Sequence, residues 1–198
     1  MKVLFIGDIV GRRARNYAQE KIVELKTKLK LDAIIVNVEN SAGGFGVTPS
    51  ICDDFFRVGA DVLTTGNHIW DKREIISYIT KNDRLLRPLN MIEGTPGLGM
   101  TIVDLDEGKI GVANIMTNLF MQKTDNVFDK IPDILENLKL KKNVDFSLVD
   151  IHGEASSEKM ALGNALDGKV TAVVGTHTHV PTADYQILEN GTAYITDV

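Results

Sequence analysis

Residues 170–179 read Val-Thr-Ala-Val-Val-Gly-Thr-His-Thr-His, an apolar run that ends in glycine and is followed by two histidines. The run Val170–Gly175 is typical of a buried strand of a parallel sheet, in which apolar residues follow one another without alternation. His177 and His179 then lie just beyond the carboxyl end of that strand. Such a pair is more often a pair of metal ligands than two outward-facing strand residues, and both interpretations stay open at this point.

The same arrangement recurs along the chain. Four other predicted strands end in polar side chains that can bind a metal: Lys2–Gly7 before Asp8, Ala33–Val38 before Glu39 and Asn40, Val62–Thr65 before Asn67 and His68, and Phe146–Ile151 before His152. All four histidines of the chain lie at these strand ends. Because sites in open α/β sheets form beyond the carboxyl ends of the strands, we expect these side chains to converge on one metal or acid–base site.

Taken singly, each residue has an ordinary alternative. Asp8 could cap the following turn, and Glu39-Asn40 could be a polar turn before Gly43-Gly44-Phe45-Gly46. Asn67 could simply tolerate a left-handed backbone. The glycine cluster lacks the spacing of a phosphate-binding loop. The prediction of a site therefore rests on the combination of strand ends and not on any one residue.

Helical patterns alternate with the strands, which predicts an α/β fold with antiparallel additions. The expected helices are a segment with Ala18, Ile22, Leu25 and Leu29 on one face, Ser50–Val58 after the cap Thr48-Pro49, Arg73–Thr80, Val127–Leu140 and Ser157–Leu166. Pro132 would make the fourth helix begin just before it. The expected hairpins are Met100–Leu105 with Lys109–Asn114, and Tyr185–Leu188 with Thr192–Thr196 across a type I′ turn at Asn190-Gly191.

Length and composition exclude several classes of protein. A chain of 198 residues with a net charge of −5 suits a single domain over residues 1–198 and does not favour binding to long nucleic acid. The single cysteine, Cys52, excludes a disulfide framework and favours a cytoplasmic location. No apolar run approaches the roughly 20 residues of a membrane span, and the N-terminus does not read as a signal peptide. The first strand is not followed by the glycine pattern of a dinucleotide-binding domain.

The combined motifs resemble those of the calcineurin-like metallophosphoesterase superfamily, and in particular its YmdB-like branch of bacterial cyclic-nucleotide phosphodiesterases. The segments that carry this resemblance are Gly7–Gly11, Asn37–Gly44, Thr65–Asp71, Val149–His152 with Glu154, and Val174–Asp184. The resemblance implies a four-layer α/β/β/α sandwich with mixed sheets. Members of this branch continue past the equivalent of Val198 with a further strand and helix, so we expect a fold that is truncated at its C-terminus.

The resemblance also implies a ligand set for two metal ions. One ion would be held by Asp8, Glu39, Asn40 and His179, and the other by Glu39, Asn67, His152 and His177, with Glu39 as the bridge. Val10 stands where the wider superfamily has a histidine, a change that is normal in this branch. Oxygen and nitrogen ligands without a thiolate favour iron or manganese, with zinc, cobalt or magnesium as alternatives.

The implied activity is hydrolysis of 2′,3′-cyclic or 3′,5′-cyclic nucleotides. A hydroxide held between the two ions would attack phosphorus, and His68 would protonate the leaving oxygen as a general acid. Asp150 could orient His152 as a hydrogen-bonded carboxylate, or it could be a surface residue. The expected partner is a small phosphodiester, and the resemblance suggests a homo-oligomer. Two rival functions remain: a phosphomonoesterase or nucleotidase, and a regulatory protein that binds nucleotides with little turnover.

Overall fold

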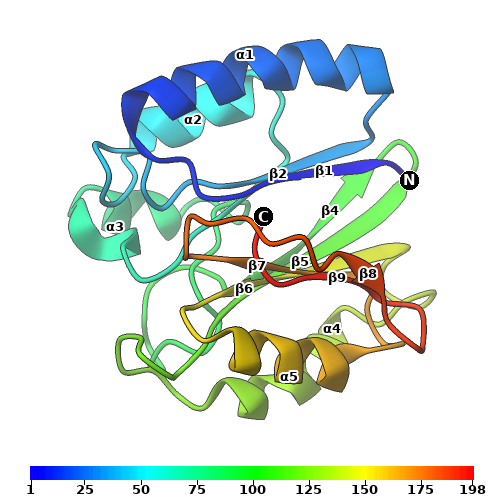
Figure 1. The fold of residues 1–198 in the computed structure, drawn as a ribbon. Helices are drawn as coiled ribbons and strands as arrows, with labels where there is room; N and C mark the ends of the chain where they lie inside the picture. The colour runs from blue at the N-terminus through cyan, green and yellow to red at the C-terminus, as the bar shows by residue number, and fades with distance from the viewer.

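The computed structural model describes residues 1–198 and contains two β-sheets that lie face to face (Figure 1). The first sheet is parallel and consists of β1 (Val3–Ile6), β2 (Ala33–Asn37) and β3 (Val62–Thr64). The second has the order β4-β5-β6-β7-β9-β8 and consists of β4 (Met100–Leu105), β5 (Gly108–Met116), β6 (Phe146–His152), β7 (Ala172–Thr176), β8 (Gln186–Ile187) and β9 (Ala193–Ile195). The β4–β5 and β8–β9 pairs are antiparallel and the others are parallel, so this sheet is mixed.

Helices cover the outer face of each sheet. Helices α1 (Gly11–Leu29) and α2 (Pro49–Arg57) lie on the first sheet, and α4 (Ile131–Asn137) and α5 (Ser156–Leu166) lie on the second (Figure 1). The short elements α3 (Ile75–Ile79), η1 (Ile69–Asp71) and η2 (Val127–Lys130) complete the helical structure. Three hydrophobic clusters fill the spaces between these layers. The predicted four-layer α/β/β/α sandwich with mixed sheets is confirmed.

The layer between the two sheets changes from apolar to polar toward the carboxyl ends of the strands. Leu148 of β6 belongs to the apolar cluster between the sheets. Asp150 and His152 lie two and four residues further along the same strand, so their side chains point to the same face. Both are completely buried. The sequence of β6 therefore carries polar groups into the interior at one edge of the sandwich, and the candidate site lies at that edge.

Most predicted elements agree with the structure to within one or two residues, which is the ordinary uncertainty of element ends. The predicted cap of α2 is confirmed, because Oγ1 of Thr48 accepts a hydrogen bond from the backbone N–H of Ile51. For the helix predicted over Val127–Leu140, the start just before Pro132 is confirmed, but the helix ends at Asn137 and not at Leu140. A 3₁₀ turn begins after Asn126, and α4 itself starts only at Ile131, because Pro132 cannot donate a backbone hydrogen bond to a preceding turn.

The predicted hairpin of Tyr185–Leu188 with Thr192–Thr196 is present as the β8–β9 pair, but the predicted type I′ turn at Asn190-Gly191 is wrong. The N–H of Gly191 donates to the carbonyl of Leu188, so the turn is centred one residue earlier, and Gly191 alone has a positive φ of 102°. Asp167 accounts for the difference, since its carboxylate accepts hydrogen bonds from both the backbone and the side-chain N–H of Asn190. This is the three-residue hairpin loop in which glycine supplies the left-handed position.

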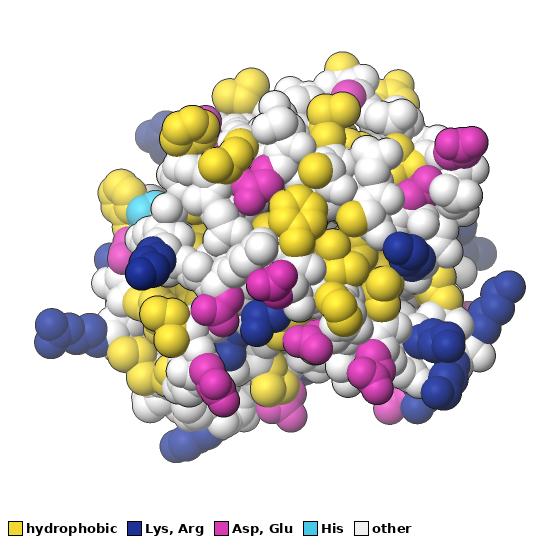
Figure 2. Space-filling view, turned by 90° about the horizontal axis from the view of Figure 1, so that it is seen from below, with side chains coloured by type: hydrophobic (Ala, Val, Ile, Leu, Met, Phe, Trp, Pro, Cys, Tyr) yellow, Lys and Arg dark blue, Asp and Glu magenta, His cyan; other side chains and the backbone are white.

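The outer surface beside the second sheet carries side chains of mixed charge. On the face covered by α4 and α5, acidic, basic and hydrophobic side chains are interspersed (Figure 2). None of the helices combines the length and the apolar character needed to cross a lipid bilayer.

Candidate metal centre

Three atoms that could bind a metal ion surround Nε2 of the buried His152. Nε2 of His152 lies 3.0 Å from Oε1 of Glu39, 3.0 Å from Oδ1 of Asn67 and 3.1 Å from Nδ1 of His177. These residues come from the carboxyl ends of β2, β3, β6 and β7, in both sheets. Ligand atoms of Glu39, His152 and His177 all lie within 4.8 Å of one another. The structure thus brings together the four residues that were predicted as one ligand set.

A second group of predicted residues lies beside the first. Oδ1 of Asn40 lies 3.3 Å from Nε2 of His179. The amide N–H of Asn40 donates to the carbonyl of Gly44 at 2.8 Å, which leaves the side-chain oxygen pointing toward the histidine. Oδ2 of Asp8 accepts the backbone N–H of His177 at 2.9 Å. All eight predicted site residues therefore lie at one edge of the fold, His68 included.

Two observations test whether these residues suit a metal ion. Oδ1 of Asp8 is buried and has no hydrogen-bond partner, a costly state for a carboxylate oxygen unless a cation compensates it. Gly66 lies against the cluster so closely that a Cβ there would overlap His152 and Glu39. The space beside these donors is therefore kept free of side-chain atoms. Both features fit a site built to hold a cation.

We predict that Gly66→Ala weakens metal binding. The added methyl group would displace the ring of His152 or the carboxylate of Glu39, because both are fully packed. Overpacking of this kind costs about 1–3 kcal/mol of unfolding free energy. We expect metal affinity to fall by at least roughly tenfold, because mutations of residues that orient metal ligands have effects of this size. Isothermal titration with Mn²⁺ and thermal unfolding would measure the two effects.

Gly94→Ala is the control for this prediction. Gly94 has a positive φ of 83°, and nothing lies within 4 Å of a Cβ at this position. Gly94→Ala should therefore lower the free energy of unfolding, because alanine is strained at a positive φ, but it should leave the metal affinity unchanged. Equal loss of affinity in both variants would contradict the assigned role of the space at Gly66.

Charges within the cluster reinforce one another. Burial alone would raise the pKa of Glu39, but the charge of His152 and its hydrogen bond bring that pKa below its usual value. Burial would lower the pKa of His152, yet Glu39, Asp8 and Asp150 together raise it to about 9. For His177, burial and the nearby charge of His152 lower the pKa. These shifts favour an ionised Glu39 and a neutral His177, which are the forms that bind a metal ion.

A buried chain of hydrogen bonds fixes the orientation of His152. Its Nδ1 lies 2.9 Å from Oγ1 of Thr176, and that hydroxyl donates to Oδ1 of Asp150 at 2.7 Å. Because the hydroxyl proton is used on Asp150, Nδ1 of His152 is the donor to Thr176, and Nε2 faces the cluster. Thr64 and Asn37 donate to the other oxygen of Asp150. The surface interpretation of Asp150 is wrong, since the residue is fully buried and reaches His152 through Thr176.

Two further carboxylates contact histidines of the site. Both lie in or beside segments that carry the family resemblance, but neither was predicted as a site residue. Oε2 of Glu154 lies 3.3 Å from Nε2 of His177, and Oδ2 of Asp71 lies 2.7 Å from Nδ1 of His68. The backbone N–H of His68 donates to Oε2 of Glu39 at 3.2 Å, so His68 borders the cluster. Asp71 lies three residues after His68, the histidine that it contacts, so this spacing was available as a signal. Glu154 contacts His177, 23 residues further along the chain, and no local spacing indicates that contact.

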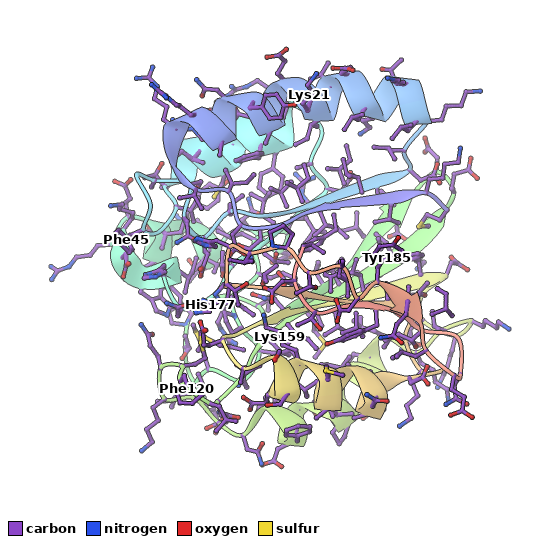
Figure 3. The ribbon with its side chains drawn as sticks, in the orientation of Figure 1. Lys21, Phe45, Phe120, Lys159, His177 and Tyr185 are labelled. Carbon is purple, nitrogen blue, oxygen red and sulfur yellow. The ribbon has the colours of Figure 1, made fainter.

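The loop that carries His177 and His179 has a strained backbone. Their φ angles are 104° and 58°, in a region that non-glycine residues seldom occupy. A buried ion pair supports this loop: Nζ of Lys159 lies 2.8 Å from Oδ2 of Asp197 and 2.8 Å from the carbonyl of Thr176. Figure 3 shows Lys159 reaching from α5 toward this region. The fold therefore uses a fully buried lysine to hold the histidine loop.

Comparison with known proteins places the chain in a family. A model of the YmdB-like protein family matches residues 4–198. The chain belongs to the YmdB-like family. The chain is similar to the 2′,3′-cyclic-nucleotide 2′-phosphodiesterase of Bacillus subtilis (strain 168). The two sequences are 46% identical over 198 residues, which cover 100% of this chain and 74% of the relative.

Solved structures agree with membership of the YmdB-like family. A hypothetical protein from Thermus thermophilus superposes with a TM-score of 0.92 at 36% identity, over 100% of this chain and 76% of that one. A structure described as a novel phosphatase from Mycoplasma pneumoniae superposes with a TM-score of 0.88 at 34% identity, over 100% of this chain and 71% of that one. The predicted family is confirmed, and with it the prediction of an enzyme of the phosphoesterase class.

Proposed function

We propose that this protein is a metal-dependent phosphodiesterase that hydrolyses cyclic nucleotides, 2′,3′-cyclic or 3′,5′-cyclic. The observation that carries the proposal is the convergence of Glu39, Asn67 and His177 around Nε2 of His152, with His68 at its border. The name of the Bacillus subtilis relative supports the diester as substrate. The oxygen and nitrogen donors without a thiolate support a metal of the iron or manganese kind.

Contacts among the predicted ligands support two proposed ligand sets. In the proposal, Glu39, Asn67, His152 and His177 hold one ion, and Asp8, Glu39, Asn40 and His179 hold the other. Two such ions, when bound, supply positive charge for the phosphate oxygens and activate water for attack on phosphorus. Asp150, acting through Thr176, would orient His152 as a metal ligand, and Glu154 would orient His177.

His68 is the general acid of the proposal. Its Nδ1–H donates to Asp71, so in the protonated ring the second proton is carried by Nε2. Asp71 fixes the orientation of the ring, which keeps this second proton pointed away from the carboxylate and available for the leaving alkoxide. The contact of the His68 backbone with Glu39 places the acid beside the proposed metal bridge.

Several finer expectations belong to the same proposal. They are iron or manganese as the native metal, a homo-oligomer in solution, a cytoplasmic location and one metallophosphoesterase domain over residues 1–198. Size-exclusion chromatography with light scattering would test the oligomer. Elemental analysis of protein purified from its own host would test the metal.

A substrate panel tests the proposed reaction. The protein, reconstituted with Mn²⁺ or Fe²⁺, would be assayed on 2′,3′-cyclic nucleotides, 3′,5′-cyclic nucleotides and open-chain nucleoside monophosphates. We expect kcat/KM to be at least about tenfold higher for a cyclic diester than for any monoester, a difference of roughly 1.4 kcal/mol in transition-state binding. Faster cleavage of monoesters would favour the nucleotidase, and binding without turnover would favour the regulatory protein.

A further inference from the structure

A glycine-rich loop after β2 presents an aromatic side chain beside the candidate site. Gly43, Gly44 and Gly46 all have positive φ angles, of 80°, 102° and 75°. The loop closes on itself, because the N–H of Ala42 donates to the carbonyl of Gly46 at 2.9 Å. It is also tied to Asn40 twice, through Gly44 N–H to the Asn40 carbonyl and through the Asn40 side chain to the Gly44 carbonyl. The tip of the loop is therefore fixed relative to a predicted metal ligand.

Phe45 forms that tip and is exposed over 58% of its surface. It belongs to none of the three hydrophobic clusters, so packing of the core does not explain an aromatic residue here. Its ring lies 5.0 Å from the ring of His68, centroid to centroid, at an interplanar angle of 69°. Figure 3 shows Phe45 on the same side of the molecule as His177. The Phe45 ring is thus exposed to solvent and lies in contact with His68, the proposed general acid.

We propose that Phe45 is the surface on which the nucleobase of the substrate stacks. This inference rests on the proposed function, because His68 marks the side on which the leaving ribose oxygen, and hence the nucleoside, must lie. A rigid aromatic ring exposed on that side meets the flat face of a base, and every base offers such a face. The rigid loop means that little conformational freedom is lost when the base binds. Phe45 is then a specificity residue for nucleotides over phosphodiesters without a base.

Another role for Phe45 would be to orient His68 through the edge-to-face contact of the two rings. The two roles differ in what they do to a substrate without a base. Stacking affects only substrates that carry a base, whereas a disturbed His68 slows every substrate. A pair of substrates that differ only in the base separates these roles.

The experiment compares adenosine 2′,3′-cyclic phosphate with ribose 2′,3′-cyclic phosphate, using wild type and Phe45→Ala. We expect kcat/KM of the variant to fall about tenfold on the nucleotide, mainly through KM, and to stay within about twofold on the sugar phosphate. Phe45→Trp should restore activity on the nucleotide. Tyr17→Ala is the control, since Tyr17 is an aromatic residue of similar exposure, 63%, on α1. It should change neither value.

A binding measurement supplies a readout that is independent of turnover. Calorimetric titration with adenosine 3′-monophosphate should show about tenfold weaker binding to Phe45→Ala, with unchanged binding of inorganic phosphate. Equal loss on both cyclic substrates, or no loss on the nucleotide, would overturn the stacking role. If wild type hydrolyses neither substrate, the proposed function fails, and the binding titration alone decides the role of Phe45.

Discussion

Glu39→Gln is expected to abolish detectable diester hydrolysis and to lower metal affinity by more than about a hundredfold. Loss of an outer carboxylate that only orients a ligand already costs about 10–100-fold in metal affinity, and Glu39 lies at the centre of the cluster. Its two oxygens serve two groups: Oε1 faces Nε2 of His152, and Oε2 accepts the N–H of His68. Glutamine removes the negative charge and replaces one oxygen by a donor that repels a cation.

The measurement is the metal content and affinity of the purified variant, followed by its activity at saturating Mn²⁺. Glu107→Gln is the matched control. Glu107 lies in the exposed β4–β5 turn, and its substitution by glutamine removes the same negative charge far from the cluster. Two ions bound to Glu39→Gln with wild-type affinity would show that Glu39 is not the bridge. Circular dichroism would verify that the variant retains its fold.

His68→Ala is expected to lower kcat on cyclic nucleotides by about 10²–10⁴-fold while both metal sites stay filled. The metal sites should survive because only the backbone N–H of His68 contacts Glu39, and alanine keeps that group. Asp71→Asn should give a smaller loss, since the ring remains and only its charged partner is removed.

The leaving group separates acid catalysis from other roles of His68. A p-nitrophenyl diester releases a stable phenolate and needs little help from an acid, so the loss in His68→Ala should shrink at least about tenfold on that substrate. Equal losses on nucleotide and p-nitrophenyl substrates would contradict the general-acid role. A loss of bound metal in His68→Ala would point instead to a structural role.

The position of the site was predictable because strand ends carry direct information. The apolar runs before Asp8, Glu39 and His152 identify buried strands, and parallel strands bring their carboxyl ends to one edge. The chain has only four histidines, so their common placement could not be obscured by others. The four-layer arrangement itself depended on the family resemblance, since periodicity does not say how two sheets pack.

Contacts between distant segments were not predictable in the same way. Thr176 connects His152 to Asp150 only because β6 and β7 are paired in one particular register. The type of turn at Asn190 was mispredicted because Asp167, 23 residues earlier, accepts a hydrogen bond from the backbone N–H of Asn190. Local turn preference is a small energy, and a charged acceptor nearby overrides it. Such contacts depend on how distant segments pack together, and the local sequence does not predict them.

Metal stoichiometry tests the central claim most directly. Protein freed of metal with a chelator and reloaded with Mn²⁺ would be examined by elemental analysis, with diester hydrolysis measured on the same sample. The account predicts two ions per chain, loss of activity on chelation and its recovery as the second ion binds. Full activity in metal-free protein, or saturation at fewer than two ions per chain with full activity, would contradict it.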